Sequence, residues 1–471
     1  MNNTKDIATV CGWIDHPVAD RGIHLADEVD GWDYCSYPDL ADLTRRMATI
    51  LRERGLQPGE GVCVVMPTGF TAIAAFYGVW AAGGVFTPVS PPLLGGMDQY
   101  IVHVAAILDQ AQPRLLVTSP DLAHLVQTAV DAQSDARSEI VVVDPDVLRS
   151  APPIDELITP TEAALLQFTS GSTGIPRGVR ISWANLATNI DIISRLVRWE
   201  DGDAMASWLP LYHDMGLVGT FLADVTKQGN LYLMRPDQFV RNPLRWLRAM
   251  QHAQHTASPS FALGYAAHRV RPEDLEGVDL SGWRTLAVGS EPIDVSDLQQ
   301  FYDLTAPAGF PMEAFTLAYG LAEATLLVTS SHRGEPITAL QIDSTTLRVG
   351  ERVDILDESP IDPGFALDGG GWVTGLGYST PEARVRIVDE DGAPLPDGTL
   401  GEVVVAGDSV SAGYHAVDDG HTFVGGELYT ADSGFLWKGQ LFVLGRLGTS
   451  LKVRGRSVFM EDVESRLLSE V

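Results

Sequence analysis

Hydroxyl side chains, glycines and one cation gather in the segment TSGSTGIPRG, residues 169–178. Glycines let the backbone turn successive N–H groups toward one side, which is how many loops bind anions. The alternative is a surface turn rich in Ser and Gly. Because the segment follows an apolar run and precedes a helical pattern, we favour a loop that holds nucleotide phosphates. The residues concerned are Thr169, Ser170, Gly171, Ser172, Thr173, Gly174 and Arg177.

Two later segments, AVGSEP and AYGLAEAT, end a predicted strand with small residues followed by a carboxylate. Ligands of open α/β sheets bind at the carboxyl ends of the strands. Tyr319 can stack on a base, and Glu323 can hold Mg²⁺. Read singly, each segment could equally be a turn. The predicted pocket lining is Gly289, Ser290, Glu291, Tyr319, Gly320 and Glu323.

Charged residues in two further segments could bind the rest of a nucleotide. In SWLPLYHDMGLVG, His213 and Asp214 begin an apolar helix, where a lone histidine is more often a core or cap residue. In YTADSGFLWKGQLFVLGRLG, we place Asp432 in a turn before a hairpin and Arg446 at the end of that hairpin. A carboxylate and a guanidinium can hold ribose hydroxyls, although a surface hairpin alone would explain the pattern.

The elements that position these residues follow from hydrophobic periodicity. Short apolar runs alternate with helical stretches over residues 62–145 and again from 160 to about 335, which predicts parallel sheets in two stacked α/β subdomains. After 335 the chain is β-rich and predicts a small antiparallel sheet or barrel, with residues 362–379 as a loop. We expect a large domain over 1–445, made of subdomains 1–160, 161–335 and 336–445, then a hinge and the start of a further domain over 446–471.

The bulk composition restricts the partners. The 471 residues carry 32 Lys and Arg against 62 Asp and Glu, a net charge of −30, which argues against nucleic acid or an anionic membrane surface as a partner. Three cysteines without a CxxC pair favour a reducing cytoplasm. The apolar stretch FTAIAAFYGVWAAGGVFTPV is interrupted by glycines and a proline, so we expect a buried helix plus strand there.

Four motifs, in the order FTSGSTGIPRGV, YGLAEAT, YTADSGFL and GRLGTSLKVRG, resemble those of the adenylate-forming superfamily. WLPLYHDMGLVG, GSEPI and the segment PITALQIDSTTLRVGERVDI are typical of its fatty acyl-AMP ligase branch. The resemblance implies an acyl-CoA synthetase-like fold and an enzyme that uses ATP and Mg²⁺. It would join a fatty or related carboxylic acid to AMP, release pyrophosphate, and pass the acyl group to the phosphopantetheine thiol of an acyl carrier protein.

The resemblance also implies a role for each motif. Residues 169–174 and Arg177 would hold the β- and γ-phosphates, and His213 would lie beside the carboxylate and α-phosphate, which Thr325 could also reach. Glu323 would bind Mg²⁺, and Asp432 and Arg446 the ribose. Adenine would be framed by Gly289, Ser290, Glu291, Pro292 and Tyr319, with Gly320, Leu321 and Ala322 beside it, and the acyl pocket by Met215, Phe261 and Leu263.

The sequence departs from the family pattern at three places. Arg177 stands where the family usually has Lys, and Gly448 follows Gly445-Arg446 where a charged hinge residue is usual. The family's lid domain is represented in residues 446–471 by its first strand and helix start, so we favour a segment of a longer protein that forms acyl-AMP slowly by itself. Two alternatives are an acyl- or aryl-CoA ligase, indicated by Lys452, and a degenerate member that binds acyl-AMP without forming it efficiently.

Overall fold

The computed structural model describes residues 3–92, 96–134, 138–158, 160–169, 176–362, 367, 369–418, 420–447, 451–453 and 456–458. The chain divides into two compact units. The first comprises Met1–Asp191, Glu200–Arg241 and Ser411–Asp419, and the second comprises Ile192–Trp199, Asn242–Val410 and Gly420–Val471.

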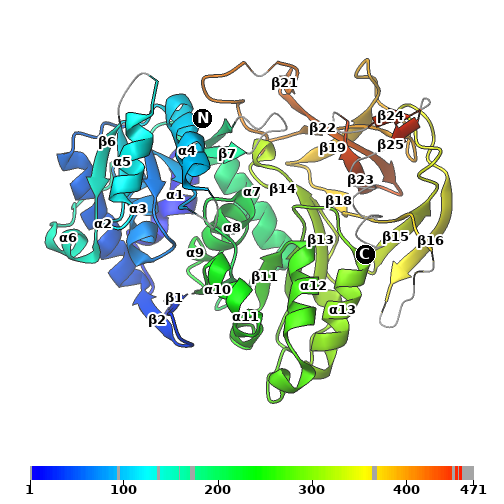
Figure 1. The fold of residues 1–471 in the computed structure, drawn as a ribbon, viewed down its shortest axis with the longest axis horizontal. Helices are drawn as coiled ribbons and strands as arrows, with labels where there is room; N and C mark the ends of the chain where they lie inside the picture. Colours follow the sequence, from blue (N-terminus) through cyan, green and yellow to red (C-terminus); the bar gives the residue numbers. More distant parts are fainter. Residues whose placement is uncertain are drawn as a thin grey trace. The chain divides into compact units, whose positions relative to one another are not determined.

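A six-stranded sheet, of order β6-β5-β3-β4-β7-β8, forms much of the first unit (Figure 1). All neighbours are parallel except β8, which is antiparallel to β7. This confirms the predicted parallel α/β layer. The strands are β3 (Gly61–Val65), β4 (Val85–Val89), β5 (Leu115–Thr118), β6 (Glu139–Val142), β7 (Ala163–Thr169) and β8 (Arg177–Ser182), and the helices between them are α3 (Phe70–Ala81), α4 (Met97–Ala111), α5 (Ala123–Asp131) and α6 (Pro145–Ser150).

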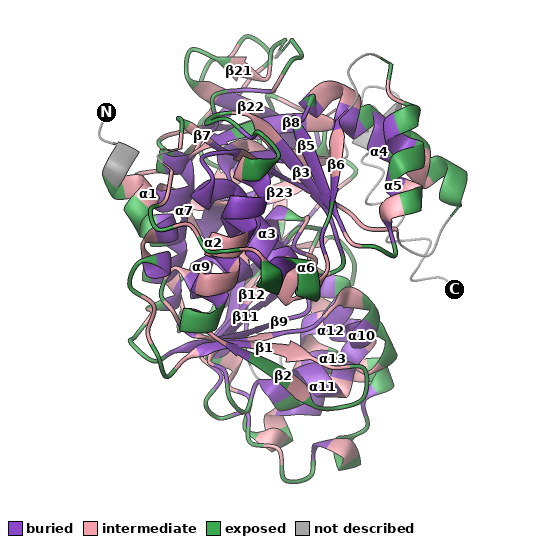
Figure 2. Ribbon diagram, turned by 90° about the vertical axis from the view of Figure 1, so that its left-hand side faces the viewer, coloured by how far each residue is buried: buried purple, intermediate pink, exposed green. Residues whose placement is uncertain are grey.

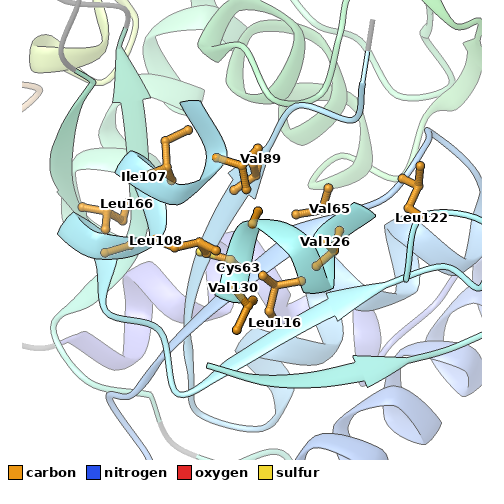
Figure 3. Packing of buried hydrophobic residues seen from close by; sticks show 13 residues of the cluster. Cys63, Val65, Val89, Ile107, Leu108, Leu116, Leu122, Val126, Val130 and Leu166 are labelled. Carbon is orange, nitrogen blue, oxygen red and sulfur yellow. The ribbon is translucent and has the colours of Figure 1, made fainter. Parts of the chain in front are cut away.

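One core of this unit lies where α4 and α5 cover the sheet. Figure 3 shows Leu108 of α4 and Val130 of α5 gathered around Cys63 and Leu116 of the strands, and these four side chains are at most 2% exposed. Strands covered by helices need apolar side chains on that face, which is why their sequences read as continuous apolar runs. In Figure 2, β3 and β5 are buried, whereas α4 and α5 present an exposed outer face.

A second set of strands in the first unit joins segments that are distant in sequence. β1 (Gly22–Ala26) pairs in parallel with β10 (Asn230–Leu233), which pairs in parallel with β9 (Ala204–Ser207). β2 (Trp32–Ser36) pairs antiparallel with β1. The helices of this unit are α1 (Asn3–Cys11), η1 (Gly12–Ile14), α2 (Tyr37–Glu53), α8 (Asp214–Gly216), the π-helix η2 (Leu217–Leu222), α9 (Ala223–Val225) and α10 (Pro236–Arg241), together with α7 (Trp183–Val197) as far as Asp191.

The second unit begins with strands that pair in the order β11-β12-β13-β14-β18. The first three are parallel, and β14 and β18 are antiparallel to their neighbours. The strands are β11 (His255–Ser258), β12 (Thr285–Val288), β13 (Phe315–Gly320), β14 (Leu327–Ser330) and β18 (Tyr378–Ser379). The helices are α11 (Pro243–Ala249), α12 (Ser260–Arg269), α13 (Val295–Thr305) and the short η3 (Pro272–Leu275), η4 (Ala306–Ala308), η5 (Met312–Ala314) and η6 (Ala322–Ala324).

Antiparallel strands fill the rest of the second unit, as predicted. β15 (Ile337–Ile342) pairs with β16 (Ile355–Ile361) and with β17 (Trp372–Thr374). The prediction of a loop over 362–379 is wrong at β17 and β18, because the β-forming residues between the glycines find partners in β15 and β14. The remaining strands are β19 (Arg384–Val388), β20 (Gly401–Ala406), β21 (Phe423–Val424), β22 (Glu427–Trp437), β23 (Gln440–Arg446), β24 (Leu451–Val453) and β25 (Arg456–Val458).

Within the described ranges, no helix combines the length and the apolar character that a bilayer crossing requires.

Candidate active site

The predicted phosphate loop joins two antiparallel strands of the first unit. Thr169 ends β7 and pairs directly with Arg177, the first residue of β8. The helix predicted from Trp183 is confirmed as α7, but the loop leads first into strand β8, which the sequence analysis missed, because RGVRIS pairs along β7. A helix N-terminus therefore does not follow this loop directly, and phosphate binding by the loop and Arg177 stays a prediction. Ser170, Gly171, Ser172, Thr173 and Gly174 lie outside the described residues.

His213 occupies the N-cap position of the short helix α8, which confirms the predicted start of a helix at His213 and Asp214. Its Nδ1 lies 2.8 Å from Asp214 Oδ1, whereas the Met215 N–H is 3.4 Å from that nitrogen and 2.7 Å from the Asp214 oxygen. The shorter contact assigns the Nδ1 proton to a bond with Asp214, which leaves Nε2 as the ring nitrogen that can face a ligand. This hydrogen bond raises the pKa of His213 above its ordinary value, in spite of partial burial, which acts in the opposite direction.

Replacing Asp214 with asparagine is expected to lower the pKa of His213. A raised pKa keeps the imidazolium present to higher pH, and its contribution is lost as the pH rises through that value. If the imidazolium supports activity, the alkaline limb of the kcat/KM profile shifts to lower pH in Asp214→Asn. The pH–rate profile measures this shift, and an NMR titration of the His213 ring follows the pKa directly. If the alkaline limb is unchanged in Asp214→Asn and is still present in His213→Gln, that limb belongs to the titration of another group.

Tyr319, Asp432 and Arg446 come together in the second unit. The Tyr319 hydroxyl donates to Asp432 Oδ2 at 2.5 Å, and Arg446 Nε donates to Asp432 Oδ1 at 3.2 Å. Asp432 is 8% exposed, and burial together with this carboxylate raises the pKa of Tyr319 well above its ordinary value. Each carboxylate oxygen has two lone pairs and can accept more than one hydrogen bond, which is the capacity that binding of ribose hydroxyls requires.

Asp432 lies inside β22, so its predicted position in a turn is wrong. The strand continues because Ala431 takes a φ of 59° and the pairing shifts register nearby, which keeps Asp432 opposite Arg446. Glu402 of β20 supports this irregularity, since its carboxylate accepts the Ala431 N–H at 2.9 Å. Sequence reasoning missed Glu402, and its one signal was a carboxylate at the start of an otherwise apolar strand, GEVVVA.

In the two segments predicted to frame adenine, the backbone lies close to neighbouring backbone carbonyl groups. A Cβ on Gly289 would lie 2.6 Å from the Ala318 carbonyl oxygen, and one on Gly320 would lie 2.1 Å from that of Leu326. Ser290 has a φ of 74°, a strained value for a residue with a side chain. Its neighbour Glu291 accepts the Phe261 N–H at 2.7 Å at the start of α12. Only small residues fit at the two glycines. Pro292 follows the bend at residues 290–291, and Leu321 follows the end of β13 directly.

Glu323 and Thr325 follow Tyr319 in and just after the single turn η6. Glu323 is half-buried, and Thr325 is fully buried with a φ of 72°. The Thr325 hydroxyl donates to the Ser409 carbonyl at 2.7 Å, so its one proton is already used; contact with an α-phosphate stays a prediction. Among the described residues no group of three or more metal-ligating side chains occurs.

Thr325→Val is expected to lower the free energy of unfolding by about 1–3 kcal/mol, because the buried hydrogen bond from the Thr325 hydroxyl to the Ser409 carbonyl is lost. Thr325→Ser keeps the hydroxyl and serves as the control. Chemical denaturation of both variants measures the difference. A Thr325→Val protein with unchanged stability and a raised KM for ATP would instead assign the hydroxyl to the nucleotide.

The predicted acyl-pocket residues differ in exposure. Met215 of the first unit is 8% exposed. In the second unit, Phe261 is 56% exposed whereas Leu263, two residues further along α12, is fully buried. The assignment of these three residues to an acyl pocket stays a prediction.

Comparison with known proteins identifies the class. Residues 15–415 match the family described as AMP-binding enzyme. The 4-hydroxyphenylalkanoate adenylyltransferase of Mycobacterium marinum is 32% identical, covering 87% of this chain and 68% of the relative. A long-chain-fatty-acid–AMP ligase of Mycolicibacterium smegmatis is 31% identical, with the same coverage. The fatty acyl-adenylate ligase of Legionella pneumophila, solved with acyl adenylate and pyrophosphate, superposes with a TM-score of 0.81 at 29% identity, covering 94% of this chain and 77% of that chain.

These matches confirm the resemblance and the α/β fold class. The chain belongs to the AMP-binding enzyme family. Enzymes of this family use ATP, and the neighbouring structure with acyl adenylate and pyrophosphate contains the two products of an adenylation.

Proposed function

We propose that this protein is an ATP-dependent acyl-AMP ligase that converts a fatty carboxylic acid and ATP into acyl-AMP and pyrophosphate. Its relatives named as fatty-acid–AMP ligases support this assignment. The observation that carries it is the contact of Tyr319 and Arg446 with the buried carboxylate of Asp432, which supplies a preorganised acceptor for ribose hydroxyls. We also propose residues 1–445 as the large nucleotide-binding domain and 446–471 as the hinge and the start of a lid.

In the first step, a carboxylate oxygen of the acid attacks the α-phosphorus of ATP and expels pyrophosphate. Two anions must meet, so the protein's work is positioning and charge stabilisation. Thr169, residues 170–174 and Arg177 hold the β- and γ-phosphates. The His213 imidazolium lies beside the reacting groups and offsets their charge, and Asp214 keeps it protonated to higher pH.

The nucleoside is held by the second unit. Asp432 accepts from the ribose hydroxyls, and Arg446 keeps that carboxylate in place. Tyr319 frames adenine together with residues 289–292 and 320–322, where the tight glycines let the backbone approach the base. Glu323 would hold Mg²⁺, which would supply charge neutralisation for the phosphates when bound.

Acid-dependent pyrophosphate release tests this function. The chain is mixed with ATP, Mg²⁺, hydroxylamine and a panel of saturated fatty acids, with 4-hydroxyphenylalkanoic acids as the second class of acid. The proposal expects release that depends on a fatty acid. Release with the aryl acids alone would change the substrate class, and no release with any acid would overturn the ligase and favour a protein that only binds acyl-AMP.

In the second step we propose that a phosphopantetheine thiol of an acyl carrier protein attacks the acyl carbon and releases AMP. The segment 336–355, typical of acyl-AMP ligases, supports a carrier protein, and it forms β15 and the start of β16 here. CoA and phosphopantetheinylated carrier protein, supplied in separate reactions, distinguish the acceptors by mass spectrometry of the thioester. Thioester on CoA alone would favour the CoA ligase instead.

A further inference from the structure

The guanidinium of Arg177 lies over the ring of Tyr414, 5.3 Å from its centroid, within the first unit. Tyr414 is 7% exposed, and Arg177 is half-buried at the start of β8. A planar guanidinium stacks well on an aromatic face, and the attraction grows as the pair is withdrawn from water. The side chain of Arg177 therefore has a defined support next to the loop that joins β7 and β8.

The backbone holds Tyr414 against β8. Tyr414 forms an antiparallel bridge with Val179. On either side of the bridge, the Arg180 N–H donates to the Gly413 carbonyl at 3.0 Å, and the His415 N–H donates to the Gly178 carbonyl at 2.7 Å. The segment 411–415 thus pairs with β8 through one isolated bridge, and two backbone hydrogen bonds hold the ring in place in addition to side-chain packing.

Further contacts hold the start of β8 in place. The Gly178 N–H donates to Gln110 Oε1 at 2.7 Å, and a Cβ on Gly178 would lie 2.9 Å from Leu166 Cδ1 and 3.0 Å from Phe168 Cζ. The strand therefore has little freedom directly after Arg177. Backbone and ring together restrict where the guanidinium can lie.

We propose that Tyr414 is a positioning residue for Arg177, holding the guanidinium ready to bind the phosphates of ATP and pyrophosphate. This inference rests on the proposed role of Arg177 in phosphate binding. It also gives a physical reason for arginine at a position where lysine is usual, because an ammonium lacks the flat face that a guanidinium lays on a ring. The ring touches Arg177 and acts on the phosphates through it.

The test compares Tyr414→Leu with Tyr414→Phe, which keeps the aromatic face. Tyr414→Leu is expected to raise the KM for ATP and the Kd for inorganic pyrophosphate about three- to tenfold, which is the size of a partly buried cation–π contact. Tyr414→Phe should stay within about twofold of the wild type. The KM for the fatty acid should change in neither variant. Tyr265→Leu is the matched control, because it removes the ring over which the guanidinium of Arg269 lies in α12, a similar arginine–tyrosine contact.

A double-mutant cycle distinguishes positioning of Arg177 by Tyr414 from a general destabilisation of the protein by the Tyr414 substitution. On an Arg177→Ala background, Tyr414→Leu should have no further effect on pyrophosphate binding. An equal effect with and without Arg177, or an unchanged Kd in Tyr414→Leu, would overturn the proposal. Tyr414→Met, with a flexible side chain of similar length, replaces the leucine variant if that one unfolds, and the same result is expected. Calorimetry with pyrophosphate needs no turnover, so a wild type that binds pyrophosphate without ligase activity would refute the proposed function and leave this test intact.

Discussion

Replacing Asp432 with alanine is expected to lower kcat/KM for ATP about 100-fold, with most of the change in the KM for ATP. Asp432 is buried and accepts hydrogen bonds from Tyr319 and Arg446. A hydrogen bond to a charged group contributes about 1.5–3 kcal/mol, and a tenfold loss corresponds to roughly 1.4 kcal/mol. Steady-state pyrophosphate release at varied ATP measures the effect.

The controls for Asp432 separate its charge from its contribution to folding. Asp432→Asn keeps an oxygen that accepts the Tyr319 hydroxyl but loses the charge that holds Arg446, so it should fall between wild type and alanine. Asp391→Ala changes an exposed aspartate in the same β-rich region and should have no effect on kinetics. A 100-fold loss in Asp432→Ala that appears wholly in the KM for the fatty acid would contradict a role in ribose binding.

Glu323→Ala is expected to lower the rate about 100-fold at ~1 mM Mg²⁺, because Mg²⁺ would lose its protein carboxylate while keeping its phosphate ligands. Higher Mg²⁺ should recover part of the loss. The rate measured over a range of Mg²⁺ concentrations at fixed ATP reports the change as a raised Mg²⁺ requirement. The melting temperature should change little, since Glu323 is half-buried in a single helical turn.

The chain contains a matched control for Glu323. Glu313 is the central residue of η5 (Met312–Ala314), as Glu323 is of η6 (Ala322–Ala324), but it is exposed and lies at the other end of β13. Glu313→Ala should leave the Mg²⁺ requirement unchanged. Equal losses of activity and melting temperature in Glu323→Ala would assign this carboxylate a structural role.

The sequence predicted those parts of the fold that local pattern determines. The sequences of β3 and β5 are continuous apolar runs because these strands are buried in the sheet. Hydrophobic periodicity detects such runs directly. The strand ends at Gly289 and Gly320 were also predicted, since a strand pattern that ends in small residues is a local signal in the sequence. Their tight approach to neighbouring carbonyl groups agrees with that reading.

The errors arise where pairing with distant residues decides the structure. β8 was read as the approach to a helix, yet it pairs along β7, and Asp432 was read as a turn, yet it pairs with Arg446. β1 reaches a partner about 200 residues away in β10, which no local pattern encodes. The contact between Arg177 and Tyr414 depends on the pairing of 411–415 with β8 and was equally invisible.

Transfer of oxygen from the acid to AMP tests the central claim most directly. The chain is incubated with ATP, Mg²⁺, hydroxylamine and a fatty acid labelled with ¹⁸O in both carboxyl oxygens, and the AMP is analysed by mass spectrometry. Attack of the carboxylate on the α-phosphorus places one labelled oxygen on that phosphorus, and cleavage of the acyl–oxygen bond by hydroxylamine leaves it there. The account predicts AMP with one ¹⁸O atom and an equal amount of acyl hydroxamate. Unlabelled AMP, or ADP in place of AMP, would contradict it.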